Sequence, residues 1–301
     1  AFKMEIVWGD GVQYHSAPVT SSFCGPASPM SSSISFIGGG NMAAALIGGL
    51  LAAGHERARI RVAEPSMERA QWLRDQFGIA VAATAAEAVK GTQTVVLAVK
   101  PQQMAQALNG LKLDAGATVV SIAAGVRLAS LRGWLGDAVH YVRTMPNTPA
   151  LVQKGITGLY ASADTPADAR RRAETVLKAA GEICWLKSES DIDAVTALSG
   201  SGPAYFFLLT EVLREAGEKL GLEREVAARL AQQTFIGAAE MAARSDQDVS
   251  TLRTQVTSKG GTTEAALQSL ESDGIRAIFE RALTAAAIRG KALGDLLEKS
   301  V

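Results

Sequence analysis

The chain has 301 residues, with 30 lysines and arginines against 30 aspartates and glutamates, so its formal net charge is zero. Hydrophobic residues make up 48% of the chain and charged residues 20%, a composition typical of a folded globular protein and not of a disordered one. Balanced charge gives no reason to expect nucleic acid as a partner, and no apolar run reaches the ~18 uncharged residues of a membrane span, so neither partner is expected.

Histidines and cysteines are scarce, at 3 and 2 respectively. Two cysteines alone make neither a disulfide framework nor a zinc site, so no metal site is expected and a reducing, cytoplasmic setting is the simplest interpretation. An enzyme with so few general bases and metal ligands would take most of its chemistry from a bound cofactor.

Residues 1–29 differ from the rest of the chain. They have no helical or strand period, and no charged region followed by the long apolar stretch of a signal peptide. Met30 precedes a serine run and an immediate strand. We therefore expect 1–29 to be a non-native or disordered extension upstream of a natural start at Met30, with a native regulatory arm as the alternative.

Strands and helices alternate from Ser33 to about Lys187. Apolar strands are predicted at 33–37, 59–63, 94–99, 117–122, 140–144, 157–161 and 183–186, and helices at 41–53, 66–76, 102–109 and 167–180. The fully apolar stretch Thr94–Val99 is typical of a parallel sheet that is covered on both faces. The alternation predicts an α/β domain with a Rossmann-type doubly wound sheet over residues 30–190.

From Asp191 onward the pattern is helical only. Helices are predicted at 205–220, 223–244 and 262–299, the last interrupted at Gly274, and all are rich in alanine. This pattern predicts an all-helical C-terminal domain over 191–301. Its small apolar residues suit close packing between helices, including helices of two subunits.

A glycine-rich loop joins the first strand to the first helix. Gly38-Gly39-Gly40-Asn41-Met42-Ala43 fits the pattern G-x-G-x-x-G/A in the context that dinucleotide binding requires. The first glycine permits a tight turn, the second lets the backbone approach a pyrophosphate, and Ala43 permits close packing of helix on sheet. The helix N-terminus offers N–H donors to the phosphates. A ligand-free turn between strand and helix is the alternative.

Two other strand ends carry candidate cofactor residues. Glu64 lies about 20 residues after the loop, where an acidic side chain accepts a ribose 2′-OH and favours NAD. Ser66 and Arg69 could instead help to accommodate the 2′-phosphate of NADP. Alternatively, Glu64 is a solvated turn residue with no role in binding. The run Ala98-Val99-Lys100-Pro101 ends the longest apolar strand, at the edge where such sheets bind ligands. Lys100 there either reaches a ligand or is a surface lysine.

Three loops in the second half carry further candidates. Residues 253–263 read RTQVTSKGGTT before a helix, which predicts an anion nest for a carboxylate-bearing substrate, or a plain capping loop. The Gly/Ser run at 199–205 is either a second anion site or a tight corner between domains. The run Met145–Pro149 follows a strand, and either faces the same cleft or is structural.

In combination, the segments 38–43, 98–101, 145–149, 199–205 and 257–263 resemble pyrroline-5-carboxylate reductase. The resemblance covers nearly all of 33–299 in order and spacing, and it has no counterpart for 1–29. It implies reduction of 1-pyrroline-5-carboxylate to L-proline with NADPH or NADH, the last step of proline biosynthesis. It also implies a Rossmann domain and a helical domain that interlocks two subunits, with decamers as a common larger assembly.

The resemblance also assigns residues. The residues that the resemblance implies for cofactor binding are Gly38, Gly39, Gly40, Asn41, Met42, Ala43, Glu64, Ala98, Val99, Lys100, Pro101, Ala123 and Ala124. The residues that it implies for substrate binding are Glu189, Ser258, Gly260, Gly261, Thr262 and Thr263. It places Thr263 near the ring nitrogen, as the catalytic residue. Glu64 stands where some NADP-using members have serine, and Ala85 where many have asparagine, so the cofactor preference stays open.

Two other classes of protein compete with this interpretation. A β-hydroxyacid dehydrogenase shares the plan of the domains but needs a lysine base on an early C-terminal helix, and no lysine follows Tyr205 before Lys219. A non-catalytic nucleotide sensor would keep the glycine loop without needing the intact run Thr257–Thr263.

Overall fold

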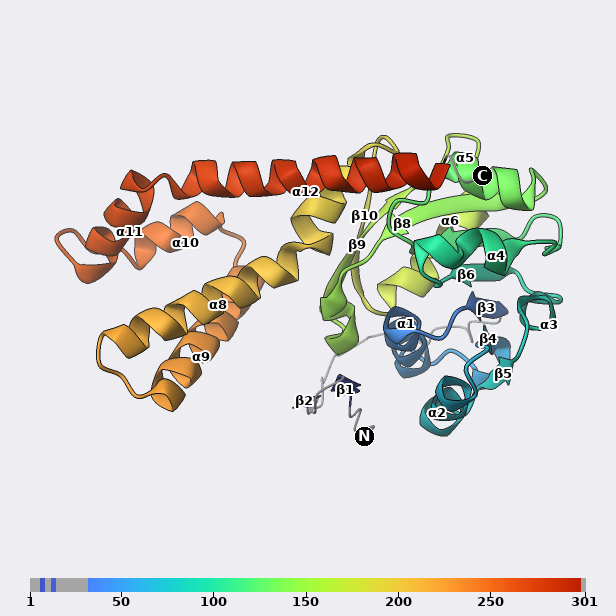
Figure 1. Cartoon of the computed structure of the whole chain (residues 1–301), viewed down its shortest axis with the longest axis horizontal. Helices are drawn as coiled ribbons and strands as arrows, with labels where there is room; N and C mark the ends of the chain where they lie inside the picture. Colours follow the sequence, from blue (N-terminus) through green and yellow to red (C-terminus); the bar gives the residue numbers. More distant parts are fainter. Residues whose placement is uncertain (1–5, 9–11, 15–31, 299–301) are drawn as a thin grey trace. The chain divides into compact units, whose positions relative to one another are not determined.

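The computed structural model describes residues 6–8, 12–14 and 32–298. The chain forms two compact units (Figure 1). The first runs to Ile192 and takes in the last turn of the final helix from Gly294, and the second covers Asp193–Leu293.

Within the segment 1–29 the structure describes two short strands. β1 (Ile6–Trp8) pairs antiparallel with β2 (Val12–Tyr14), and Ile6 lies opposite Tyr14. No strand was predicted there, because alternation over three residues is too short to recognise. The other residues of the segment lie outside the described part of the chain.

The first unit is built on an eight-stranded sheet. Its order is β10 (Gly181–Trp185), β9 (Gly155–Tyr160), β8 (His140–Met145), β7 (Thr118–Ser121), β6 (Thr94–Leu97), β3 (Ile34–Ile37), β4 (Ile60–Ala63) and β5 (Ala80–Ala82). The strands from β5 to β8 are all parallel and have the doubly wound order of a Rossmann domain. β9 pairs antiparallel with β8, and β10 runs parallel to β9. The predicted Rossmann-type sheet is confirmed.

Each face of this sheet buries its own apolar cluster. The first cluster lies under α1 (Asn41–Ala52), α2 (Met67–Phe77) and α6 (Ala167–Lys178), and the second under α3 (Ala85–Val89), α4 (Met104–Leu108) and α5 (Leu128–Leu135). Successive residues of β6 alternate between them: Val96 belongs to the first cluster, and Val95 and Leu97 to the second. Burial on both faces explains why this strand is apolar throughout.

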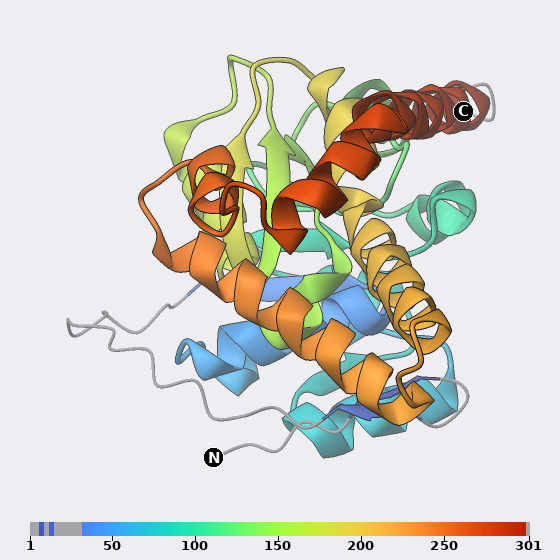
Figure 2. The same cartoon turned by 90° about the vertical axis from the view of Figure 1, so that its left-hand side faces the viewer.

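Every described element of the second unit is helical. These elements are α8 (Gly202–Lys219), α9 (Arg224–Arg244), α10 (Val249–Gln255), α11 (Thr262–Ser272) and most of α12 (Ile275–Glu298), preceded by α7 (Asp191–Val195) and a π-turn at Thr196–Gly200. α8 and α9 are neighbouring helices that pack against each other (Figures 1 and 2). The rings of Phe206 and Phe235 are stacked, with their centroids 5.5 Å apart. The predicted helical domain is confirmed, as is the break at Gly274, which has a φ of +74°.

Candidate active site

The glycine loop is crowded on its inner side and open on its outer side. Gly38 has a φ of +98°, and a Cβ added there would lie 2.8 Å from the carbonyl oxygen of Ala98, so only glycine fits. Gly40 is exposed, has a φ of −65°, and an added Cβ would have no atom within 4 Å. α1 begins at Asn41 without a side-chain cap. Its first-turn N–H groups therefore border open space that suits a phosphate.

Glu64 is tied to the glycine loop. Its Oε2 accepts a hydrogen bond from the Gly39 N–H at 2.9 Å, and its Oε1 accepts one from the Ser66 N–H at 2.9 Å. The side chain is therefore held at the carboxyl end of β4 and is not a freely solvated turn residue. A carboxylate has lone pairs to spare after two such bonds, so it can still accept a ribose hydroxyl.

Arg69 brings a positive charge to the same place. Its Nε donates to the carbonyl oxygen of Gly39 at 2.6 Å, and its guanidinium lies 4.0 Å from the ring centroid of Trp72. Burial lowers the pKa of Arg69, while the charge of Glu64 acts in the opposite direction. A carboxylate and a guanidinium thus flank the glycine loop, one suited to a 2′-hydroxyl and the other to a 2′-phosphate.

The ends of β6 and β7 lie beside this loop at the carboxyl edge of the sheet. The Ala98 N–H donates to Ile37 at 2.8 Å, and the Ile122 N–H donates to Leu97 at 3.2 Å. Ala123 is buried, while Ala124 and Lys100 are exposed. The first unit therefore brings together all the residues assigned to cofactor binding: Gly38–Ala43, Glu64, Ala98–Pro101 and Ala123–Ala124.

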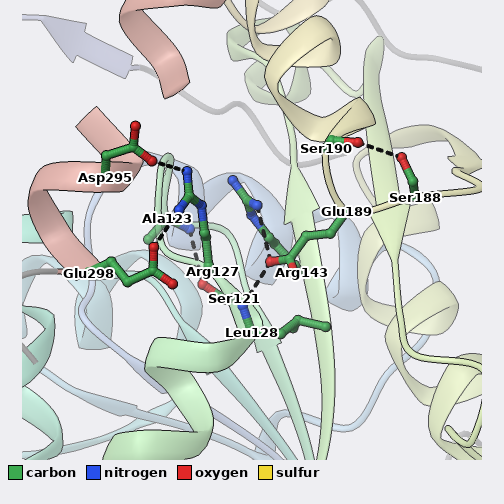
Figure 3. Close-up of polar contacts among 10 residues, drawn as sticks. All are labelled: Ser121, Ala123, Arg127, Leu128, Arg143, Ser188, Glu189, Ser190, Asp295 and Glu298. Carbon is green, nitrogen blue, oxygen red and sulfur yellow. Dashed lines mark hydrogen bonds and ion pairs between the residues drawn. The ribbon is translucent and has the colours of Figure 1, made fainter. Parts of the chain in front are cut away.

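Glu189 forms an ion pair with a buried arginine, which the sequence did not predict. Its Oε1 lies 3.1 Å from Nη1 of Arg143, whose side chain is only 3% exposed, and it also accepts the Leu128 N–H at 2.8 Å (Figure 3). Arg143 lies on β8, and Leu128 begins α5. The carboxylate thus joins a strand to a helix start, an arrangement that residue spacing alone could not reveal.

The remaining substrate candidates form one turn in the second unit. The Gly260 N–H donates to the carboxylate of Glu264 at 2.7 Å, and the Gly261 N–H donates to the carbonyl of Ser258 at 3.0 Å. Gly261 is the N-cap of α11, with no side-chain cap. Thr262 and Thr263 follow it in the first helical turn, whose N–H groups have no partner within the helix. These groups can receive a carboxylate.

The loops at 199–205 and 145–149, for which the sequence left two roles open, are each held by internal hydrogen bonds. The Tyr205 hydroxyl donates to the carbonyl of Ala197 at 3.0 Å, and the Ser199 hydroxyl to that of Val195 at 3.2 Å, which favours the corner over an anion site. Asn147 is buried, and its Oδ1 accepts the Ile156 N–H at 2.9 Å, which favours a structural role for its loop.

The described part of the chain has no metal cluster, and it has an open pocket that the sequence did not predict. No group of three or more histidine, cysteine, aspartate or glutamate side chains among the described residues could hold a metal ion. The second unit has an open pocket of about 340 Å³ that the sequence did not predict, lined by Arg253, Leu267, Leu270, Glu271, Ile275, Arg276 and Phe279.

Family models match most of the chain in two pieces. A model described as pyrroline-5-carboxylate reductase dimerisation matches residues 189–293, and one described as NADP oxidoreductase, coenzyme F420-dependent, matches 33–125. The curated pyrroline-5-carboxylate reductase of Pseudomonas aeruginosa is 50% identical over 266 residues, which cover 88% of this chain and 97% of that protein. The enzyme of the same name from Corynebacterium melassecola is 42% identical over 87% of this chain and 98% of that protein.

Solved structures agree with these matches. A pyrroline-5-carboxylate reductase from Coxiella burnetii superposes with a TM-score of 0.83 at 43% identity, covering 87% of this chain and 98% of that one. Pyrroline carboxylate reductase of Plasmodium falciparum, solved with NADP bound, has a TM-score of 0.76 at 29% identity, covering 89% and 100%.

Proposed function

The chain belongs to the pyrroline-5-carboxylate reductase family, and we propose that it reduces 1-pyrroline-5-carboxylate to L-proline with NADPH or NADH. The observation that carries this proposal is the glycine loop, in which Gly38 permits the turn and Gly40 leaves open space before the uncapped start of α1. These residues fit a dinucleotide pyrophosphate.

The bound nicotinamide cofactor would supply the hydride, and the chain would supply binding and orientation. We propose that Gly38–Ala43 hold the pyrophosphate, that Glu64 and Arg69 face the adenosine ribose, and that the strand ends at 98–101 and 123–124 orient the ring. The first turn of α11 would hold the substrate carboxylate through backbone N–H groups.

The protonation demand on the enzyme is small. A cyclic imine accepts hydride at carbon, and its nitrogen must take up one proton to become the amine. The iminium can form in solution and then already carries that proton, so no strong enzymic acid is needed. The Thr263 hydroxyl would donate a hydrogen bond to the lone pair that develops on the nitrogen as hydride reaches the carbon. Positioning the imine carbon against the hydride donor would then provide most of the rate.

The test is a steady-state assay of reduced-nicotinamide oxidation on addition of pyrroline-5-carboxylate, with NADH and NADPH compared. We expect substrate-dependent turnover that a metal chelator does not change. Oxidation of the reduced cofactor that needs no substrate, or activity that is lost on chelation and restored by zinc, would contradict the proposal. A panel of β-hydroxy acids with the oxidised cofactors separates it from the dehydrogenase alternative.

Replacing Glu64 by serine should move cofactor preference toward NADPH. Removing the carboxylate removes its repulsion of a 2′-phosphate and leaves Arg69 in place, while NADH loses an acceptor for its 2′-OH. We expect the ratio of kcat/KM values to shift about 10-fold, equivalent to about 1.4 kcal/mol. Glu68→Ser is the matched control, because it removes an exposed charge nearby in the chain, in the first turn of α2. An unchanged ratio in Glu64→Ser would remove Glu64 from the cofactor site.

A dimer would explain the apolar surface of the second unit. Its helices expose large apolar side chains, among them Phe207, Leu213, Leu230 and Ile288. Within the helical stretch Asp191–Lys219, an 18-residue window has a mean hydropathy of 1.2, enough by length and composition alone to cross a membrane, and only 17% of that window is buried. The match to a dimerisation model over 189–293 supports a second copy, not lipid, as the cover.

Assembly and location complete the proposal. We propose a cytoplasmic homodimer through the helical domain, with association into decamers, and no nucleic acid or membrane partner. Light scattering of the active protein measures the assembly. An active monomer at micromolar concentration would contradict the dimer, and a dimer that does not associate further would contradict only the decamer.

A further inference from the structure

The loop between β7 and α5, residues 122–127, is fixed to the sheet on one side. The Thr144 hydroxyl donates to the carbonyl of Ser121 at 2.9 Å, and the Ile122 N–H donates to Leu97 at 3.2 Å. This loop contains Ala123 and Ala124, the residues assigned above to the cofactor. Its far end at Leu128 is held by the carboxylate of Glu189.

The last turn of α12 holds the same loop from another direction. One guanidinium nitrogen of Arg127 contacts the carboxylate of Asp295, and a second contacts that of Glu298 (Figure 3). The Arg127 side chain is 24% exposed, against 48% and 43% for the two acids. These two ion pairs join residues that are about 170 positions apart in the sequence, and so tie the loop to the end of the chain's last helix.

The backbones also approach closely at this point. Gly125 has a φ of +78°, and a Cβ added there would lie 3.4 Å from the Gly294 nitrogen. A Cβ on Gly294 would lie 3.2 Å from the Gly125 carbonyl oxygen. The pair of glycines lets the helix lie directly on the loop, and the neighbouring Leu297 packs against the apolar cluster on that face of the sheet.

The two acids are badly placed for helix stability on their own. They lie in the last turn of α12, where the helix dipole disfavours negative charge, and they stand three positions apart, so they repel each other. No basic residue lies in that turn. The guanidinium of Arg127 offsets both penalties, which means that the acids serve the contact with the loop and not the helix.

We propose that Arg127, held by Asp295 and Glu298, is a positioning residue for the reaction: it fixes the 122–127 loop in the geometry that receives the nicotinamide end of the cofactor. The inference rests on the proposed function. It gives the last turn of α12 a part in cofactor binding, although none of its side chains would touch the cofactor.

The test compares Arg127→Ala, Arg127→Lys, the double variant Asp295→Asn/Glu298→Gln, and all three neutralising changes together. For each full-length variant, cofactor Kd is measured by fluorescence titration without substrate, alongside kcat, both KM values and melting temperature. We expect Arg127→Ala and the double variant each to weaken cofactor binding and to lower kcat, by about 10-fold, with the KM for pyrroline-5-carboxylate nearly unchanged. Arg127→Lys should recover part of the loss.

The combined variant is the decisive one. Because the three side chains form one unit, it should be no worse than Arg127→Ala alone. Arg171→Ala is the matched control, since Arg171 pairs with Asp168 on the exposed face of α6; cofactor Kd and kcat should stay at wild-type values.

Three results would overturn the proposal. In the first, the losses add independently in the combined variant. In the second, neutralising the acids leaves cofactor binding unchanged or tightens it, as expected if Arg127 touched the cofactor directly. In the third, the melting temperature falls while cofactor Kd and kcat do not change. Failure of the proposed function is distinguishable, since it would appear as absent turnover in the wild-type chain, whereas the titration needs no substrate.

Discussion

Alanine at Gly40 is expected to weaken cofactor binding about 10- to 100-fold while the free protein keeps nearly its wild-type stability. An added Cβ there meets no protein atom within 4 Å, and its φ of −65° suits any residue. The only cost to the free protein is a poorer N-cap for α1, about 1 kcal/mol. With a pyrophosphate against the loop the same methyl group overlaps the ligand, and overpacking of that kind costs about 1–3 kcal/mol.

Gly38→Ala is the matched comparison. Its Cβ would lie 2.8 Å from the Ala98 carbonyl oxygen, at a φ of +98°, so it should lower melting temperature and cofactor affinity together. Calorimetry of the free protein and titration with NADH and NADPH measure the two quantities separately. If Gly40→Ala binds both cofactors as tightly as wild type, the pyrophosphate does not lie on this loop, and the residues at 38–43 are a structural turn.

Strands with long apolar runs were predicted from the sequence, whereas the shortest strands and helices were missed. Thr94–Leu97 and Thr118–Ser121 are buried throughout and stood out as strands. β5 has three partly exposed residues and α3 has five in all, so neither has enough residues to establish a period. The reversal at β9 was not predictable, because an apolar run has no direction and only pairing with β8 sets it.

The residues of the candidate site also fall into two groups, those that a local sequence pattern reveals and those that only tertiary contacts reveal. Gly38–Ala43 and Glu64 follow from local pattern and distance along the chain, and the structure brings them together. Arg127 and Arg143 were not predicted, because their meaning comes from partners at Asp295 and Glu189, which are remote in sequence. A single arginine in a strand or a loop looks like any surface charge until its burial is known, and the 3% exposure of the Arg143 side chain depends on the tertiary structure.

Thr263→Ala is expected to lower kcat/KM by about 10²-fold or less, with cofactor affinity nearly unchanged. In the proposed mechanism its hydroxyl donates a hydrogen bond to the ring nitrogen as the imine becomes an amine. A lost hydrogen bond of about 1–3 kcal/mol sets the scale, and water could replace part of it. Because the bond strengthens in the transition state, kcat should fall as well as KM rise.

The structure sharpens this experiment by removing one competing role. Thr263 is not the cap of α11, since the N-cap is Gly261 and no side chain caps the helix. The free energy of unfolding should therefore hardly change in Thr263→Ala, and alanine has the higher helix propensity. Thr263→Ser keeps the donor and should keep most of the activity, whereas Thr263→Val keeps the shape without the donor and should resemble alanine. A valine variant with wild-type kcat would show that the hydroxyl takes no part in the reaction.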